Sequence, residues 1–287
     1  MMDIEGASLL HDGGDTCIIL IGAEHGNEPA GIRAIDTTRA LLASGDWETN
    51  ASLWGLIGNP RAVEKGTRFV DENLNRAFGR STPGTYEDVR AAEISAWLRE
   101  IAARYAKVYV LDLHSVSVGE TRIAIVMDAT RAELAKAVSP IPFTLIAPPG
   151  IIPGTLLGFA ESIGMIGLFV ECGNHASPLG EIVAMEHIER LLEHIDCLTE
   201  KKTSYAGRVS YEGAPRTYEL TEAIRPSDGF AWSLPISSEL ALTQGTEYAH
   251  DPAGPRLAPY DCFVIMPSKV PEPTDYDAGF LARRIQC

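Results

Sequence analysis

One stretch near the amino terminus, residues 17–31, constrains the fold most strongly. It reads CIILIGAEHGNEPAG. The apolar run from Cys17 to Ile21 predicts a short strand that is buried on both faces, and Gly22 and Gly26 allow a sharp turn at its carboxyl end. Because open α/β sheets place their chemistry at this edge, polar side chains that follow the strand are candidates for a site.

Two such side chains, His25 and Glu28, lie three residues apart on the turn and at the start of the next predicted helix. With a distant histidine they would complete the His₂Glu ligand set of a catalytic zinc, which leaves one position for water. The alternative is an ordinary helix start, in which Glu28 interacts with the positive end of the helix dipole and His25 is a turn residue. Two residues alone do not decide between these interpretations.

Composition narrows the class of protein. The 287 residues, 45% hydrophobic and 22% charged, are typical of a soluble globular enzyme with one large and one small domain. The sequence contains no stretch of membrane-spanning length and no signal peptide pattern, and five scattered cysteines indicate free thiols in a reducing cytoplasm. A formal charge of −15 makes nucleic acid and anionic membranes poor partners. A homo-oligomer is expected only from the general frequency of such assemblies.

The pattern of elements changes near residue 200. Residues 1–200 alternate between strand and helix, which predicts an α/β domain, whereas short segments punctuated by Gly, Pro and Thr predict a smaller β-rich domain over 201–287. His187 and His194, on the last predicted helix of the first domain, are expected on its solvated face. The predicted strands of the first domain span 17–21, 53–57, 107–113, 123–127, 144–147 and 165–170, and helices are predicted to about 43, from 85, over 154–163 and from 177.

A basic segment follows the second predicted strand. It carries Arg68, Asn75 and Arg76 in a domain with an acidic excess. The planar fork of an arginine suits a carboxylate or a developing oxyanion, and an asparagine amide adds a further donor. The alternative is a solvated loop with incidental charge.

Two later strands end in acidic or imidazole side chains. Asp112 and His114 lie two apart and therefore face the same way on a strand, so that Asp112 could orient His114. Glu171 closes an apolar strand, where one-sided desolvation raises its proton affinity and suits it to general-base work. A structural histidine and a glutamate paired with a structural arginine are the alternatives.

Taken together, these motifs resemble the succinylglutamate desuccinylase and aspartoacylase family, a branch of the zinc carboxypeptidase-like hydrolases. The resemblance covers roughly residues 17–175. It implies a zinc carboxypeptidase-like α/β domain with a mixed sheet and helices on both faces, followed by a smaller C-terminal β-rich domain. The motifs that carry it, in the order of the family, are His25-x-x-Glu28, the segment from Asn59-Pro60 to Leu74-Asn75-Arg76, Asp112-Leu113-His114 and Glu171-x-Gly173.

The resemblance also implies roles for the residues. His25, Glu28 and His114 would hold one Zn²⁺ per chain, with Asp112 beside them, and Glu171 would act first as general base and then as general acid. The implied activity is a zinc-dependent deacylase, an amidohydrolase that hydrolyses the linear amide of a small N-acyl amino acid to a carboxylate and an amine.

The remaining roles concern the substrate. By the same resemblance, Arg68 would polarise the acyl carbonyl, and Asn75 and Arg76 would bind the carboxylate of the substrate.

Two departures from the family bear on the substrate. Asn73 stands where the family commonly has an aspartate. In addition, no Lys or Arg occurs between Lys136 and Arg190, whereas aspartoacylase resembles a site with two anchors, the second being an arginine shortly before the catalytic glutamate. In this chain, the stretch shortly before Glu171 contains Glu161 and no arginine. We therefore expect an N-acyl amino acid with a neutral or cationic side chain rather than an acidic one.

Two other functions remain open on the sequence. One is a carboxypeptidase-like peptidase on the same scaffold, although the placement of Glu171 on an inner strand soon after His114 argues against it. The other is a non-catalytic binding module that has kept the fold, which an intact set of ligands makes less plausible.

Overall fold

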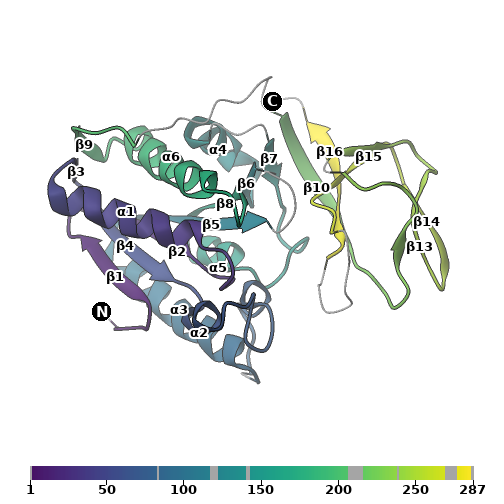
Figure 1. Cartoon of the computed structure of the whole chain (residues 1–287), viewed down its shortest axis with the longest axis horizontal. Helices are drawn as coiled ribbons and strands as arrows, with labels where there is room; N and C mark the ends of the chain where they lie inside the picture. Colours follow the sequence, from purple (N-terminus) through teal and green to yellow (C-terminus); the bar gives the residue numbers. More distant parts are fainter. Residues whose placement is uncertain are drawn as a thin grey trace.

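The centre of the protein is an eleven-stranded mixed sheet with the strand order β1-β4-β2-β5-β8-β6-β7-β10-β16-β15-β12. A computed structural model describes residues 2–82, 84–116, 122–139, 143–205, 216–237, 239–268 and 277–285. Helices cover both faces of the half of the sheet that contains β2, β5 and β8, and the C-terminal strands extend away from them (Figure 1). The predicted α/β architecture with helices on both faces is confirmed.

The elements follow one another along the chain with these bounds. The helices are α1 (Ala30–Ser44), α2 (Pro60–Lys65), α3 (Tyr86–Arg104), α4 (Ala132–Val138), α5 (Leu156–Ser162) and α6 (Leu179–His194), with the 3₁₀ turns η1 (Leu74–Arg76) and η2 (Ala129–Arg131). The strands are β1 (Ala7–His11), β2 (Thr16–Gly22), β3 (Trp47–Thr49), β4 (Ser52–Ile57), β5 (Lys107–Val116), β6 (Arg122–Val126), β7 (Phe143–Ile146), β8 (Ile166–Asn174), β9 (Leu198–Lys201), β10 (Arg216–Ile224), β11 (Ala231–Trp232), β12 (Leu240–Leu242), β13 (Glu247–Asp251), β14 (Gly254–Leu257), β15 (Cys262–Ile265) and β16 (Gly279–Ile285).

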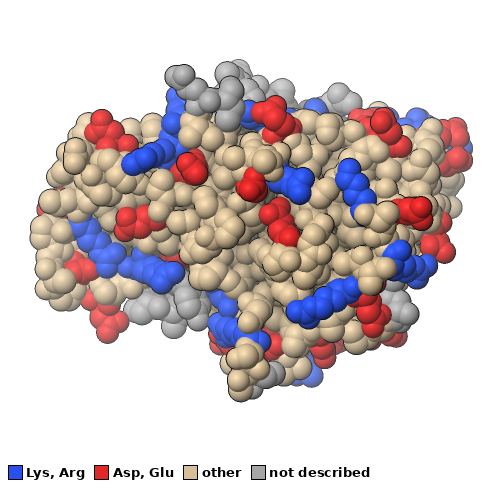
Figure 2. All heavy atoms as spheres, turned by 180° about the vertical axis from the view of Figure 1, so that it is seen from behind, with Lys and Arg blue, Asp and Glu red and all other residues tan. Residues whose placement is uncertain are grey.

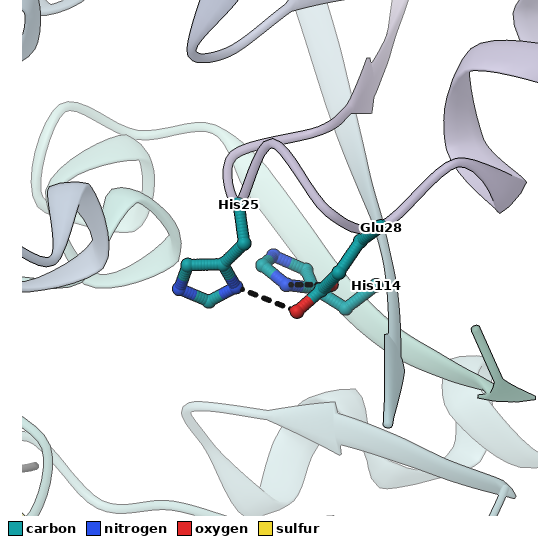
Figure 3. A group of neighbouring side chains, drawn as sticks. All are labelled: His25, Glu28 and His114. Atoms are coloured by element: carbon teal, nitrogen blue, oxygen red, sulfur yellow. Dashed lines mark hydrogen bonds and ion pairs between the residues drawn. The ribbon is translucent and has the colours of Figure 1, made fainter. Parts of the chain in front are cut away.

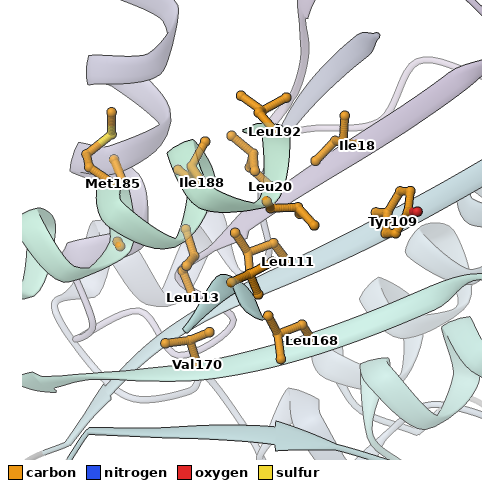
Figure 4. Close-up of a cluster of buried hydrophobic side chains, with 14 of the residues drawn as sticks. Ile18, Leu20, Tyr109, Leu111, Leu113, Leu168, Val170, Met185, Ile188 and Leu192 are labelled. Atoms are coloured by element: carbon orange, nitrogen blue, oxygen red, sulfur yellow. The ribbon is translucent and has the colours of Figure 1, made fainter. Parts of the chain in front are cut away.

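Strand β2 separates two hydrophobic cores. Ile18 and Leu20 point into the core that includes α1 and α6, whereas Cys17, Ile19 and Ile21 point into the core that includes α3. This alternation is the two-residue period of a strand, and it explains why the segment is apolar without interruption. Figure 4 shows the first core, where side chains of β2, β5 and β8 pack against α6.

The helix α6 is buried more deeply than its sequence predicts. His187 is fully buried, so its expected place on the solvated face is wrong, whereas His194 is exposed as expected. The reason is that α6 contacts α4 in addition to α1 and β8. The His187 ring is fixed there because Nδ1 contacts the carbonyl oxygen of Val183 at 2.6 Å and Nε2 contacts the hydroxyl of Ser139.

The parallel strands β2, β5 and β8 are neighbours in the sheet, so their carboxyl ends meet at one edge. The C-terminal strands continue the same sheet, because β10 pairs in parallel with β7 and then antiparallel with β16. A separate three-stranded sheet, β11-β13-β14, completes this part. The domain boundary near residue 200 stays a prediction.

The surface carries mixed charge on the face that Figure 2 shows, where acidic and basic side chains are interspersed without one continuous basic area. Within the described ranges, the structure contains no helix of sufficient length and hydropathy to cross a bilayer.

Candidate metal centre and active site

The turn after β2 is shaped by a close approach to α2. A Cβ atom on Gly26 would lie 2.1 Å from the main-chain carbon of Ala62, so only glycine fits there. The Gly26 amide donates to the carbonyl oxygen of Arg68, and the Glu28 amide donates to that of His25. The turn therefore fixes His25 and Glu28 on one side of the loop, beside the segment that carries Arg68.

Three side chains converge at the carboxyl edge of the sheet (Figure 3). His25 Nδ1 lies 2.9 Å from Glu28 Oε1, and His114 Nδ1, from β5, lies 3.0 Å from Glu28 Oε2. The three residues are only 1% to 4% exposed, and each offers a ligand atom within 4.8 Å of the others. Two imidazole nitrogens and a carboxylate are donor types that a zinc site uses, so His25, Glu28 and His114, here named the ligand cluster, could hold a metal ion.

The far side of the His25 ring is held by Asn73. His25 Nε2 lies 3.0 Å from Asn73 Oδ1, and the same oxygen accepts a hydrogen bond from the Asn75 amide. Because Oδ1 is thus an acceptor, Nε2 carries the proton and Nδ1 keeps a lone pair for a cation. Asn73 therefore retains the acceptor function that an aspartate would have at this position.

Two carboxylates hold the far side of the His114 ring. Its Nε2 lies 3.1 Å from Glu24 Oε2 and 3.1 Å from Asp112 Oδ1, so its Nδ1 faces Glu28. The pairing with Asp112 follows from their two-residue spacing. Sequence reasoning missed Glu24; its only signal was an acid directly before His25 in a turn that follows a buried strand.

Burial and charge set the protonation of the ligands. Burial lowers the pKa of His25 to about 4, so this ring is neutral near pH 7. Burial alone would also lower the pKa of His114, but the carboxylates of Asp112 and Glu28 overcome it and hold the value well above its usual range. Burial opposes ionisation of Glu28, yet the two imidazoles hold its pKa well below the usual value. Without a cation, the raised pKa of His114 keeps a proton on this ring, and its charge stabilises the Glu28 carboxylate. A bound cation would take the place of the proton on Nδ1.

Glu171 lies directly beside this cluster. It pairs in register with His114 across β5 and β8, and it is 7% exposed. Burial and the charge of Glu28 raise the pKa of Glu171 to about 8, and its Oε2 finds no hydrogen-bond partner among the described residues. A buried carboxyl group of raised pKa with a free oxygen is suited to accept and return a proton.

The residues present fit a divalent cation. Four carboxyl groups are buried within this small region, those of Glu24, Glu28, Asp112 and Glu171, and burying acidic groups is costly unless positive charge compensates them. Oxygen atoms of Glu24 and Glu171 also lack hydrogen bonds within the described part of the chain. A dication held by Nδ1 of both histidines and by Glu28 would supply that charge.

The three residues expected to contact substrate lie around the cluster, although their surroundings differ. Arg68 Nη1 lies 3.1 Å from Glu28 Oε1, and its side chain is 41% exposed. The side-chain oxygen of Asn75 accepts a hydrogen bond from the Leu156 amide, which leaves the NH₂ group as its donor. Arg76 forms an ion pair with Asp277 at 2.9 Å.

A buried carboxylate organises the loop that carries these residues. Glu87, in the first turn of α3, accepts hydrogen bonds at Oε1 from Asn59 Nδ2 and the Val70 amide, and at Oε2 from the amides of Asp71 and Glu72. It is fully buried. Glu87 thereby fixes the chain between Arg68 and Asn73. Sequence reasoning missed this role, because its four donors come from two other segments.

Two further residues differ from expectation or add to it. Glu161, in α5, accepts a hydrogen bond from the Gly167 amide near the beginning of β8, at the opposite end of this strand from the ligand cluster. His175 Nδ1 lies 2.7 Å from Ser115 Oγ, and the Ser115 amide donates to Glu28 Oε2. Ser115 therefore connects His175 to Glu28 of the ligand cluster.

Comparison with known proteins shows which proteins the chain is similar to. Residues 15–196 match the family model of the succinylglutamate desuccinylase/aspartoacylase catalytic domain. The chain is 29% identical over 256 residues to the succinylglutamate desuccinylase of Pseudomonas paraeruginosa. This alignment covers 83% of this chain and 75% of the relative.

Solved structures show the same fold. The succinylglutamate desuccinylase of Vibrio cholerae superposes with a TM-score of 0.75 at 19% identity, over 95% of this chain and 82% of the other. Murine aminoacylase 3 superposes with a TM-score of 0.64 at 16% identity, over 96% and 97%. Since the family model covers well over half of the chain, the protein belongs to the succinylglutamate desuccinylase/aspartoacylase family.

Proposed function

We propose that the protein is a zinc-dependent deacylase that hydrolyses the amide bond of a small N-acyl amino acid. The observation that carries this proposal is the convergence of His25, Glu28 and His114 beside buried Glu171. Family membership supports amide hydrolysis, since the relatives in the comparison are named as a desuccinylase and an aminoacylase.

The chain would contribute to the reaction as follows. His25, Glu28 and His114 would hold Zn²⁺, which when bound increases the acidity of water and polarises the acyl oxygen. Glu171 accepts the proton of the attacking water, and Arg68 donates hydrogen bonds to the oxyanion that develops on the acyl oxygen. Glu171 then returns the proton to the departing amine nitrogen.

The substrate would be held by its free carboxylate. Arg76 provides a planar cation and Asn75 an NH₂ donor at the end of the loop that Glu87 fixes. Holding the carboxylate at this point would place the amide between Arg68 and Glu171, and positioning of this kind lowers the barrier by removing the need to find the reactive geometry.

Metal analysis combined with an assay for released amine tests the proposal. We expect about one zinc per chain, turnover of several N-acyl amino acids, and loss of turnover on chelation that added zinc restores. The matched variant His25→Gln should lose the metal, whereas His194→Gln, an exposed histidine remote from the cluster, should keep it. A protein that binds no zinc, or that releases carboxy-terminal residues from unblocked peptides instead, would contradict the proposal.

A further inference from the structure

The expected anchor of the substrate, Arg76, is already bound by the protein itself. Its Nη1 donates to the Asn75 carbonyl oxygen at 2.6 Å, and its Nη2 donates to Asp277 Oδ2 at 2.9 Å. The side chains of Arg76 and Asp277 are only 16% and 8% exposed. Because water screens such a pair weakly, the charge of Asp277 offsets much of the charge that Arg76 presents to a ligand.

Asp277 reaches this position from the C-terminal part of the chain, two residues before β16. The turn of residues 73–76 connects Asp277 with the ligand cluster. Asn73, at one end of this turn, contacts the ring of His25, and Arg76, at the other end, binds Asp277. Asp277 therefore lies close enough to act electrostatically on a ligand held by Arg76.

Within the described ranges, neither Arg68 nor Arg122 provides a second anchor. Arg68 already faces Glu28. Arg122 pairs in register with Cys172, which packs in the core on the α1 and α6 face, so Arg122 points to the face of the sheet away from Glu171. A substrate with one carboxylate can share Arg76 with Asp277, whereas a second carboxylate would meet the buried acids without a further cation from the described part of the chain.

We infer that Asp277 is a specificity-determining residue that selects N-acyl amino acids with a neutral or cationic side chain and disfavours those with an acidic one. This inference rests on the proposed function for its substrate class. The electrostatic effect of Asp277 on an acidic ligand does not depend on turnover and can be measured separately.

The decisive variant is Asp277→Asn, which removes the charge but keeps an oxygen that can accept from Arg76. We measure kcat and KM of the zinc-loaded full chain for N-acetylaspartate, N-acetylalanine and the N-acetyl derivative of 2,4-diaminobutyrate. The ratio of kcat/KM for the acidic substrate to that for the neutral one should rise at least about tenfold, chiefly through KM, and Asp277→Glu should restore the original preference.

The matched control is Asp251→Asn. Asp251 is also 8% exposed and also binds an arginine, Arg256, at 2.7 Å, but it lies in β13, in the separate three-stranded sheet. This variant should leave the selectivity ratio unchanged. An unchanged ratio in Asp277→Asn, or a native protein that prefers the acidic substrate, would overturn the inference while leaving the deacylase proposal intact.

Binding separates the two proposals if the native protein turns over none of these compounds. In that case the deacylase proposal fails, and calorimetric titration of N-acetylaspartate into the zinc-loaded protein still decides the inference. At least tenfold tighter binding to Asp277→Asn than to the native chain and to Asp251→Asn supports the role of Asp277. Equal affinities overturn it.

Discussion

Glu171 and His114 lie opposite each other in register on the neighbouring parallel strands β8 and β5. Both side chains are buried, so the sheet itself fixes the Glu171 carboxyl group beside the His114 ring. The position of this carboxyl group therefore does not depend on the movement of a loop.

Replacing this carboxyl group should separate metal binding from turnover. Glu171→Gln keeps the size of the side chain but removes the proton acceptor, so kcat should fall at least about 100-fold while the zinc content stays at one per chain. The matched control is Glu161→Gln. Glu161 is a partly buried glutamate of α5 that contacts the beginning of β8, away from the ligand cluster. Its turnover should equal that of the native protein; full activity in Glu171→Gln would refute the assignment of the base.

The hydrogen bond between Asn73 and His25 should govern zinc affinity. Asn73→Ala leaves His25 Nε2 without its acceptor, which should weaken zinc binding by about 10- to 100-fold in a competition titration with a chelator. Asn73→Asp retains an acceptor oxygen and should bind zinc at least as tightly as the native chain. Unchanged affinity in Asn73→Ala would show that Asn73 does not orient the ring.

The carboxylate of Glu87 should be essential to the loop that carries Arg68 and Asn73. Glu87→Gln places an NH₂ group against main-chain amides that need an acceptor, so urea unfolding should show a loss of at least about 2 kcal/mol, with lower turnover as well. Glu93, on the same helix, is half exposed, and Glu93→Gln should change the free energy of unfolding by less than about 0.5 kcal/mol. Equal stabilities of the two variants would contradict this role.

His187 should make the fold sensitive to acid. Burial lowers its pKa to about 4, against 6.5 for an unperturbed histidine, so the unfolded chain binds the extra proton between these values. Stability from this group is therefore complete above pH 6.5 and is lost as the pH falls towards 4, with about 2 to 3 kcal/mol lost by pH 4.5.

Unfolding in urea at pH 7 and pH 4.5 measures this effect. His187→Gln cannot take up the proton, so its free energy of unfolding should fall less between the two pH values than that of the native chain. The exposed His194 on the same helix provides the control, and His194→Gln should retain the native pH dependence. Identical pH dependence of all three proteins would show that His187 is not kept neutral by the fold.

Local sequence signals predicted much of the fold. The apolar run of β2 forms the expected strand, and α3 begins at Tyr86 with Thr85 as its N-cap, which agrees with the helix predicted from residue 85. The six-residue α2 and the strand β16 were not predicted, because α2 is too short for a helical period to be recognised and β16 gains its order by pairing with β10 and β15.

The candidate site divides in the same way. Residues that share a turn or a strand, such as His25 with Glu28 and Asp112 with His114, could be grouped from their spacing. Glu24 meets His114 across 90 residues, and Asp277 meets Arg76 across 201. Such contacts arise only when the sheet brings distant strands together, so no local pattern reveals them.

The pairing of β7 with β10 has a practical consequence for anyone who trims this chain. A fragment ending near residue 200 would lack β10, so β7 would become an exposed edge strand. Its unpaired main-chain amides and carbonyls could then pair with strands of other molecules. The fragment would also lack Asp277. Expression of residues 1–200 alone should therefore yield aggregates, and any soluble fragment would present Arg76 without the counter-charge of Asp277.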